Sequence, residues 1–129
     1  MAKSKRSQLI DKLDDVVSKI VRARDKVCVL CGRKDKLTCG HIFGRGHHSL
    51  RWDIRPDGNC HTQCWPCNRR HVFDTYPYYD WHMRKFGKDR FDELYQEWQA
   101  TRQFKIWELK ELYEQLIKAN RHLRDKREG

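Results

Sequence analysis

The sequence predicts a mostly helical α+β protein whose irregular centre is fastened by a zinc ion. Two matched pairs, Cys28-x2-Cys31 and Cys64-x2-Cys67, enclose a segment without hydrophobic periodicity, and helical periodicity precedes and follows that segment. The chain has 129 residues, and its mean hydropathy of −1.00 leaves room for only a modest core. A domain with so small a core commonly needs a metal to stabilise it.

The first element expected is an amphipathic helix from about Ser7 to Arg24, within an N-terminal segment of residues 1–26. Its apolar residues recur at intervals of three and four: Leu9, Ile10, Leu13, Val16, Val17, Ile20 and Val21. Charged residues occupy the other face. This helix therefore needs a packing partner and is a poor place for chemistry.

The central segment, residues 27–75, is expected to form the zinc-bound core. The β-prone stretches Val27–Leu30 and Leu37–Cys39 predict two short strands, and the run Pro56-Asp57-Gly58 marks a long loop. A helix is expected after Cys67. A long irregular loop in so small a protein is either functional or disordered. Metal-binding pairs at both ends favour a functional loop.

The C-terminal segment, residues 76–129, is expected to form helices that pack on the core. The spacing predicts helices over residues 76–86, 88–100 and 105–124, the first opened by Pro77 and ended by Gly87. Its aromatic side chains are expected in the core rather than stacked on bases: Tyr76, Tyr78, Tyr79, Trp81 and Phe86. The last helix carries leucines seven residues apart, so it should pack on the first helix or on a second copy of the chain, as a homodimer.

The two cysteine pairs predict one structural zinc ion. Thiolates three residues apart on a tight turn point at one ion, and two such turns complete a tetrahedron with Zn–S bonds of about 2.3 Å. Four protein ligands leave no open position. The chain shows no continuous apolar run for a signal peptide or a membrane span, so we expect a cytoplasmic protein, in which paired cysteines are more often metal ligands than disulfides. The remaining Cys39 and Cys60 are expected as small buried residues.

The loop between the cysteine pairs holds the candidate chemistry. The net charge of +10 indicates a polyanionic partner, most simply nucleic acid. His41 can take a proton near neutral pH, Asn59 can brace the loop, and Asn68 lies on the helix that follows the second pair. Basic residues around the loop are candidate phosphate contacts: Arg45, His47, His48, Arg51, Arg55, Arg69 and Arg70. A metal-dependent nuclease has this pattern of residues.

These residues together resemble a known family. Cys28-x2-Cys31, Gly40-His41, Asn59 and Cys64-x2-Cys67-Asn68 resemble the HNH nucleases of the ββα-metal type, and the run from Gly40 to Asn68 is similar to the phage NinG (Rap) recombination proteins. The resemblance implies a zinc-stabilised ββα-metal core flanked by helices. It also implies a phage-encoded endonuclease that uses Mg²⁺ or Mn²⁺ on duplex, nicked or branched DNA in the cytoplasm of a bacterial host.

The resemblance also assigns roles to individual residues. It makes His41 the general base, Asn59 the middle asparagine and Asn68 a ligand of the catalytic ion. Many HNH sites have a metal-binding Asp before the His, where this chain has Gly40. A second ligand would then come from Asp53, His47 or His48, or His41 would itself bind the ion. Two alternatives stay open: a non-catalytic zinc-dependent module that binds nucleic acid, and a structural protein that recruits a partner through its helices.

Overall fold

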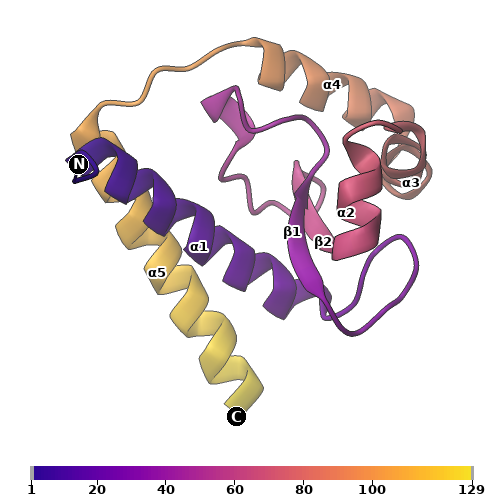
Figure 1. Ribbon diagram of the computed structural model, residues 1–129, viewed down its shortest axis with the longest axis horizontal. Helices are drawn as coiled ribbons and strands as arrows, with labels where there is room; N and C mark the ends of the chain where they lie inside the picture. The colour runs from indigo at the N-terminus through magenta and orange to yellow at the C-terminus, as the bar shows by residue number, and fades with distance from the viewer. Residues whose placement is uncertain (1, 129) are drawn as a thin grey trace.

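The computed structural model describes residues 2–128 and shows a mostly helical α+β fold (Figure 1). In chain order the elements are α1 (Lys5–Asp25), β1 (Leu37–His41), the short 3-10 helix η1 (His48–Leu50), β2 (Cys60–Cys64), α2 (Trp65–His71), α3 (Tyr76–Phe86), α4 (Lys88–Gln99) and α5 (Ile106–Glu128). The α1 and α5 helices lie side by side on one side of the β1–β2 hairpin, and α3 and α4 lie on the other.

The α1 helix begins with a side-chain cap and ends in a left-handed residue. The Ser4 hydroxyl accepts a hydrogen bond from the Ser7 amide at 3.1 Å, and Lys26 has φ 68°. Its apolar face is buried against α5, which contributes Leu109 and Leu116. The predicted packing of the last helix on the first is therefore confirmed, and the long periodic apolar stripes explain why both helices were found in the sequence.

The two strands form an antiparallel hairpin in which Leu37 pairs with Cys64 and His41 with Cys60. The sequence missed β2, because all five of its residues are buried and no polar–apolar alternation marks it. The strand predicted at Val27–Leu30 is wrong. That segment turns around the Cys28 sulfur, the Gly32 amide donates to the Cys28 carbonyl at 2.8 Å, and only the Val29 amide reaches β2.

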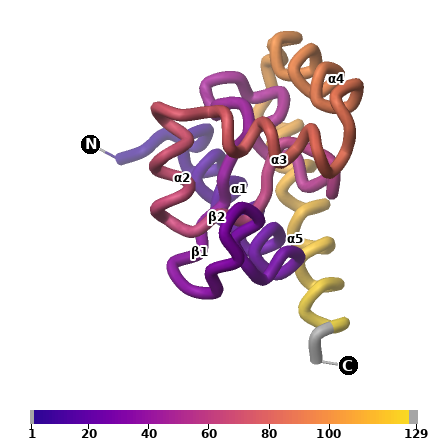
Figure 2. Tube along the Cα trace, turned by 90° about the vertical axis from the view of Figure 1, so that its right-hand side faces the viewer, coloured from indigo at the N-terminus to yellow at the C-terminus, as the bar shows by residue number. Residues whose placement is uncertain are grey.

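The α2 helix follows β2 without a loop and has no buried residue. Its position depends on a few polar contacts. The Trp65 amide donates to the Lys36 carbonyl at 2.8 Å, Asn68 Nδ2 donates to Thr38 Oγ1 at 3.1 Å, and His71 Nε2 donates to the Ile42 carbonyl at 2.8 Å. Together β1, β2 and α2 make a compact strand–strand–helix unit, which Figure 2 shows from the side.

A second hydrophobic cluster joins α3 and α4 to the loop after β1. Ile42, Phe43 and Leu50 from the loop pack with the fully buried Tyr78 and Leu94. Placing the aromatic segment in the core is correct for Tyr78, but it is wrong for Tyr76, whose exposed fraction is 67%. Within residues 2–128, no helix combines the length and the apolar character needed to cross a bilayer.

Between the two clusters lies a buried, neutral histidine. His61 is 2% exposed; its Nε2 donates to the Gly58 carbonyl at 2.7 Å, and its Nδ1 accepts from Arg24 at 3.2 Å. Burial is the main cause that lowers the pKa of His61 from 6.5 to about 4. The hydrogen bond to Gly58 opposes this shift, and the charge of Arg24 adds to it. Both ring nitrogens are thus satisfied only in the neutral form.

We predict that His61 makes the protein less stable as pH falls. Since the folded pKa lies below the unfolded one, the unfolded chain binds the proton first, and stability is lost as pH falls below about 6.5. Between about pH 7.5 and pH 5 this loss amounts to about 2 kcal/mol. Urea unfolding of wild type and His61→Gln at both pH values measures it. Equal pH dependence of the two proteins would contradict the prediction.

Candidate metal centre and catalytic pocket

The four predicted zinc ligands meet in one cluster. Cys28 and Cys31 come from the turn after α1, Cys64 ends β2, and Cys67 lies in the first turn of α2. Their four sulfur atoms lie within 4.8 Å of one another, and the sulfurs of Cys31 and Cys64 are 3.6 Å apart. Tetrahedral zinc takes four thiolates in this arrangement, so the geometry fits a structural zinc ion.

The electrostatics of this cluster favour a cation at its centre. Burial raises the pKa of Cys28, but amide groups of Cys64, Cys31 and Leu30 that donate to its sulfur lower the pKa to about 7. Burial and the neighbouring sulfurs raise the pKa of Cys67. The Cys28 thiolate therefore forms readily, and its negative charge opposes the formation of a second thiolate at Cys67. A divalent ion removes that opposition, because it binds every sulfur as a thiolate.

A pocket of about 660 Å³ lies between β1, α2 and the loop after β1. It is lined by two of the predicted catalytic residues, His41 and Asn68, and by the basic side chains Arg45 and Arg69. Among the described residues that line it there is no Asp or Glu. The pocket is therefore suited to an anion such as a phosphate group.

His41 lies at the end of β1 with one ring nitrogen fixed. Its Nε2 donates to the Arg51 carbonyl at 2.8 Å, which leaves the lone pair on Nδ1. The Arg51 side chain is in turn held by two hydrogen bonds to Asp14 of α1, at 2.9 and 2.7 Å. Burial is the main cause that lowers the pKa of His41 below 6.5, and the charges of Arg45 and Arg51 add to it. The imidazole is neutral at pH 7 and can accept a proton.

Two side chains of α2 face the same pocket. Because Asn68 donates through Nδ2 to Thr38, its Oδ1 is left to accept or to bind a metal. His71, three residues further on, donates through Nε2 to the Ile42 carbonyl, and its buried Nδ1 has no hydrogen-bond partner. His71 was not predicted from the sequence as a catalytic residue or a metal ligand. The Asn68-x2-His71 spacing on one helix face is the signal that would have identified it.

Asn59 braces the loop as the sequence suggested. Its side chain is fully buried, accepts from the Phe43 amide at 2.8 Å, and donates to the carbonyls of Phe43 and Leu50 at 3.0 and 3.2 Å. Its own carbonyl accepts from the Ile42 amide at 2.9 Å. Asn59 therefore shapes the loop whose Arg51 carbonyl accepts the hydrogen bond from His41, but Asn59 itself does not line the pocket.

Neither of the two positions considered for an acidic metal ligand, Asp53 and residue 40, supplies a carboxylate to the pocket. Asp53, a candidate metal ligand, lies away from the pocket and binds the Arg55 side chain and the Asn59 amide. A Cβ at Gly40 would lie 1.9 Å from the buried side-chain oxygen of Gln63, so an Asp there requires Gln63 to repack. The structure therefore does not bring a carboxylate to the position next to His41.

The predicted phosphate contacts divide into three groups. Three arginines bind acidic partners: Arg51 binds Asp14, Arg55 binds Asp53 and Glu97, and Arg70 binds Asp74. Arg45 and Arg69 line the pocket; the Arg45 guanidinium lies 3.9 Å from the Asp14 carboxylate, and the Arg69 guanidinium stacks on Trp65. The two loop histidines point elsewhere, since His47 stacks on Trp98 and His48 packs near Trp52. The pocket's positive charge thus comes from Arg45 and Arg69.

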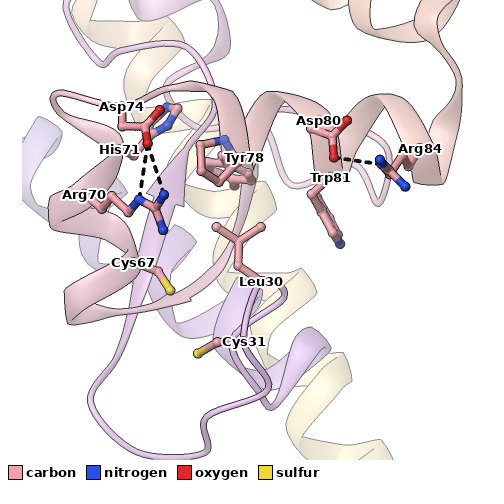
Figure 3. Close-up of a pocket in the computed structure, with 11 residues that line it drawn as sticks. Leu30, Cys31, Cys67, Arg70, His71, Asp74, Tyr78, Asp80, Trp81 and Arg84 are labelled. Atoms are coloured by element: carbon pink, nitrogen blue, oxygen red, sulfur yellow. Dashed lines mark hydrogen bonds and ion pairs between the residues drawn. The ribbon is translucent and has the colours of Figure 1, made fainter.

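A second pocket, of about 470 Å³, lies beside the zinc cluster (Figure 3). It is lined by Cys31 and Cys67 and by His71, which also lines the first pocket. The arginines at its rim are paired with nearby aspartates, Arg70 of α2 with Asp74 just after that helix and Arg84 with Asp80 on α3. Since these charges are compensated, this pocket is a weaker candidate for binding a phosphate.

Comparison with known proteins gives one family match. The family model described as "Bacteriophage Lambda NinG protein" matches residues 1–127. No curated protein and no solved structure matches the chain.

We predict that Cys67→Ser loses the zinc ion and most of the folded population. Structural zinc contributes about 10–16 kcal/mol in zinc-finger peptides, which matches or exceeds the total stability of most small domains. Zinc content by mass spectrometry and helix content by circular dichroism measure the two losses. Cys39→Ala, outside the four-cysteine cluster, is the matched control and should keep one zinc ion per chain and the wild-type helix content. A folded, zinc-free Cys67→Ser protein would refute the structural role.

Proposed function

The chain belongs to the NinG family, and we propose that it is a metal-dependent DNA endonuclease of the HNH type. The observation that carries this proposal is the pocket between β1 and α2. It combines a neutral histidine with a fixed tautomer, His41, two further lone-pair donors, Asn68 and His71, and two arginines. The family resemblance supports nicked or branched intermediates of phage recombination as substrates.

His41 supplies the general base in this proposal. Its proton is held on Nε2 by the Arg51 carbonyl, so the Nδ1 lone pair accepts a proton from the attacking water. The positive charge that then forms on the ring lies near Asp14, whose carboxylate favours the protonated form. Burial opposes that charge, which keeps the base neutral before the reaction.

Arg45 and Arg69 hold the scissile phosphate. Both are exposed at the rim of the pocket, and a guanidinium can bind two phosphate oxygens at once. Stacking on Trp65 limits the directions that Arg69 can take, so less side-chain freedom is lost on binding. These contacts position the phosphate next to His41 but carry no sequence information.

The donors in the pocket fit a divalent transition ion better than Mg²⁺. Asn68 Oδ1 and the unpartnered Nδ1 of His71 would hold the ion, with phosphate oxygens and water completing its coordination. Mg²⁺ prefers oxygen ligands and usually a carboxylate, whereas imidazole suits transition ions such as Fe²⁺, Ni²⁺ or Zn²⁺. The bound ion would neutralise the charge that develops on the phosphate and its leaving oxygen.

A zinc-dependent module that binds nucleic acid without cutting it is the second candidate. The observation in its favour is Gly40, since the Gln63 side chain would have to repack before the Asp that many HNH sites have there could fit. In that case the arginines and the stacked Trp65 would bind DNA, and His41 would serve only to anchor the loop.

We predict that His41→Ala slows cleavage of supercoiled plasmid by about 10²–10⁴ in the presence of Mn²⁺, because the general base is lost. The wild-type rate should rise with pH through a midpoint below 6.5 and stay level through neutral pH, since the pKa of His41 is lowered. His122→Ala, on the exposed face of α5, is the control. Cleavage by folded His41→Ala at the wild-type rate would show that His41 is not the general base, whereas absence of cleavage by the folded wild-type protein would favour the binding module.

A separate prediction tests the phosphate contact at Arg69. Each phosphate that is neutralised contributes about 0.9 to the slope of log affinity against log salt on duplex DNA. Arg69→Ala should therefore lower that slope by about 0.9, as measured by fluorescence anisotropy. Arg102→Ala removes an equal charge from the α4–α5 connection, where Arg102 binds Glu108, and should change the slope much less. Identical slopes for the two variants would argue against a specific contact.

A further inference from the structure

We propose that Cys39, Cys60 and His41 form a second metal site, distinct from the four-cysteine cluster, which takes a soft or borderline ion such as Zn²⁺. The three side chains bring one ligand atom each to within 4.8 Å of the other two. Among the described residues, the only other group of this kind built from His, Cys, Asp and Glu is the zinc cluster itself.

The strand register explains why these three residues meet. His41 of β1 is directly opposite Cys60 of β2, so their side chains project from the same face of the hairpin. Cys39 lies two residues before His41 and therefore projects from that face as well. Cys60 Sγ lies 3.6 Å from the Arg51 carbonyl, to which His41 Nε2 also donates. The donors thus converge on one point of the loop.

The donor set indicates the class of metal. Two thiolates and one imidazole suit zinc and similar ions and suit Mg²⁺ poorly. Two cysteines and one histidine are also an established ligand set for zinc sites that keep a fourth position open. Cys39 and His41 line the 660 Å³ pocket, so water or a small ligand can reach that fourth position.

Binding requires only a small contraction of the site. Zinc bond lengths place ligand atoms of a tetrahedral site about 3.5–3.8 Å apart, so the present separations of up to 4.8 Å need to close by about 1.3 Å at most. Cys60 is fully buried and fixed, but Cys39 is half-buried and can rotate about its Cα–Cβ bond. The four-cysteine cluster offers no such opening, since all four positions are filled by protein.

A metal ion bound at this site would prevent His41 from acting as a general base. A neutral imidazole has one lone pair, and a metal that takes it leaves none to accept a proton, whichever ring nitrogen binds. Zinc at Cys39, Cys60 and His41 and catalysis by His41 are therefore mutually exclusive. This consequence rests on the proposed nuclease function, whereas the metal site itself does not.

Cobalt binding tests the site without any DNA. Co²⁺ is added to protein that carries one zinc per chain, in the presence of a non-thiol reductant. Sulfur bound to Co²⁺ produces a charge-transfer band in the near ultraviolet, and an ion held by Asn68 and His71 does not. Wild type should bind Co²⁺ with this band. Cys39→Ala and Cys60→Ala should each lose it, and His71→Ala should keep it.

Zinc release is followed in the same titration, because Co²⁺ could also enter the four-cysteine cluster. A band that persists in Cys39→Ala together with zinc release would overturn the proposal. So would the absence of any sulfur band in folded, reduced wild type. Since Cys39 is half-buried, Cys39→Ala keeps the test valid even if the buried Cys60→Ala variant folds poorly.

Cleavage assays then test the link to His41. At constant Mn²⁺, added Zn²⁺ should slow cleavage strongly in wild type and much less in Cys39→Ala, with each rate compared with that of the same protein without added Zn²⁺. Equal inhibition of both proteins would overturn the link while leaving the cobalt result intact. Absence of cleavage by any variant, with the sulfur band present, would refute the nuclease function and support the metal site alone.

Discussion

The four-cysteine cluster is the constraint on which the rest of the site depends. The α2 helix has seven residues and buries none of them, and a helix that short is not stable by itself in water. Coordination of Cys64 and Cys67 by the ion that also binds the Cys28 turn would fix its start, and the hydrogen bonds to Thr38 and Ile42 fix its direction. Because Asn68, Arg69 and His71 all lie on α2, the pocket exists only while this helix stays in place.

The other wall of the pocket is fixed by hydrogen bonds rather than by metal. Asn59 ties together both ends of the loop, and Asp14 of α1 binds the Arg51 side chain, whose carbonyl anchors His41. Burial raises the pKa of Asp14, but hydrogen bonds from Arg51 and Trp52 outweigh it and keep the carboxylate charged. The first helix, which is not expected to carry chemistry of its own, therefore determines where His41 lies.

The parts of the structure that could be predicted from the sequence are those encoded by long apolar stripes and by the spacing of cysteines. The α1 and α5 helices were predicted because their apolar residues recur over many turns, and the four-cysteine cluster was predicted because two Cys-x2-Cys pairs permit few other arrangements. It missed β2, where Cys60, His61, Thr62, Gln63 and Cys64 are all buried and no alternation exists. It left His71 aside and offered Asp53 as a ligand, since only the tertiary fold shows which loop residue faces α2. The same limit hid the Cys39–Cys60–His41 group, which depends on strand register.

The most direct test of this account is X-ray absorption at the zinc edge, on protein that holds one zinc ion per chain. The account predicts four sulfur ligands at about 2.3 Å and no lighter ligand, because the ion joins the turn after α1 to the start of α2. A first shell that mixes sulfur with nitrogen or oxygen would contradict it. The resident zinc would then lie elsewhere, and the cross-link that positions α2 and the pocket would be absent.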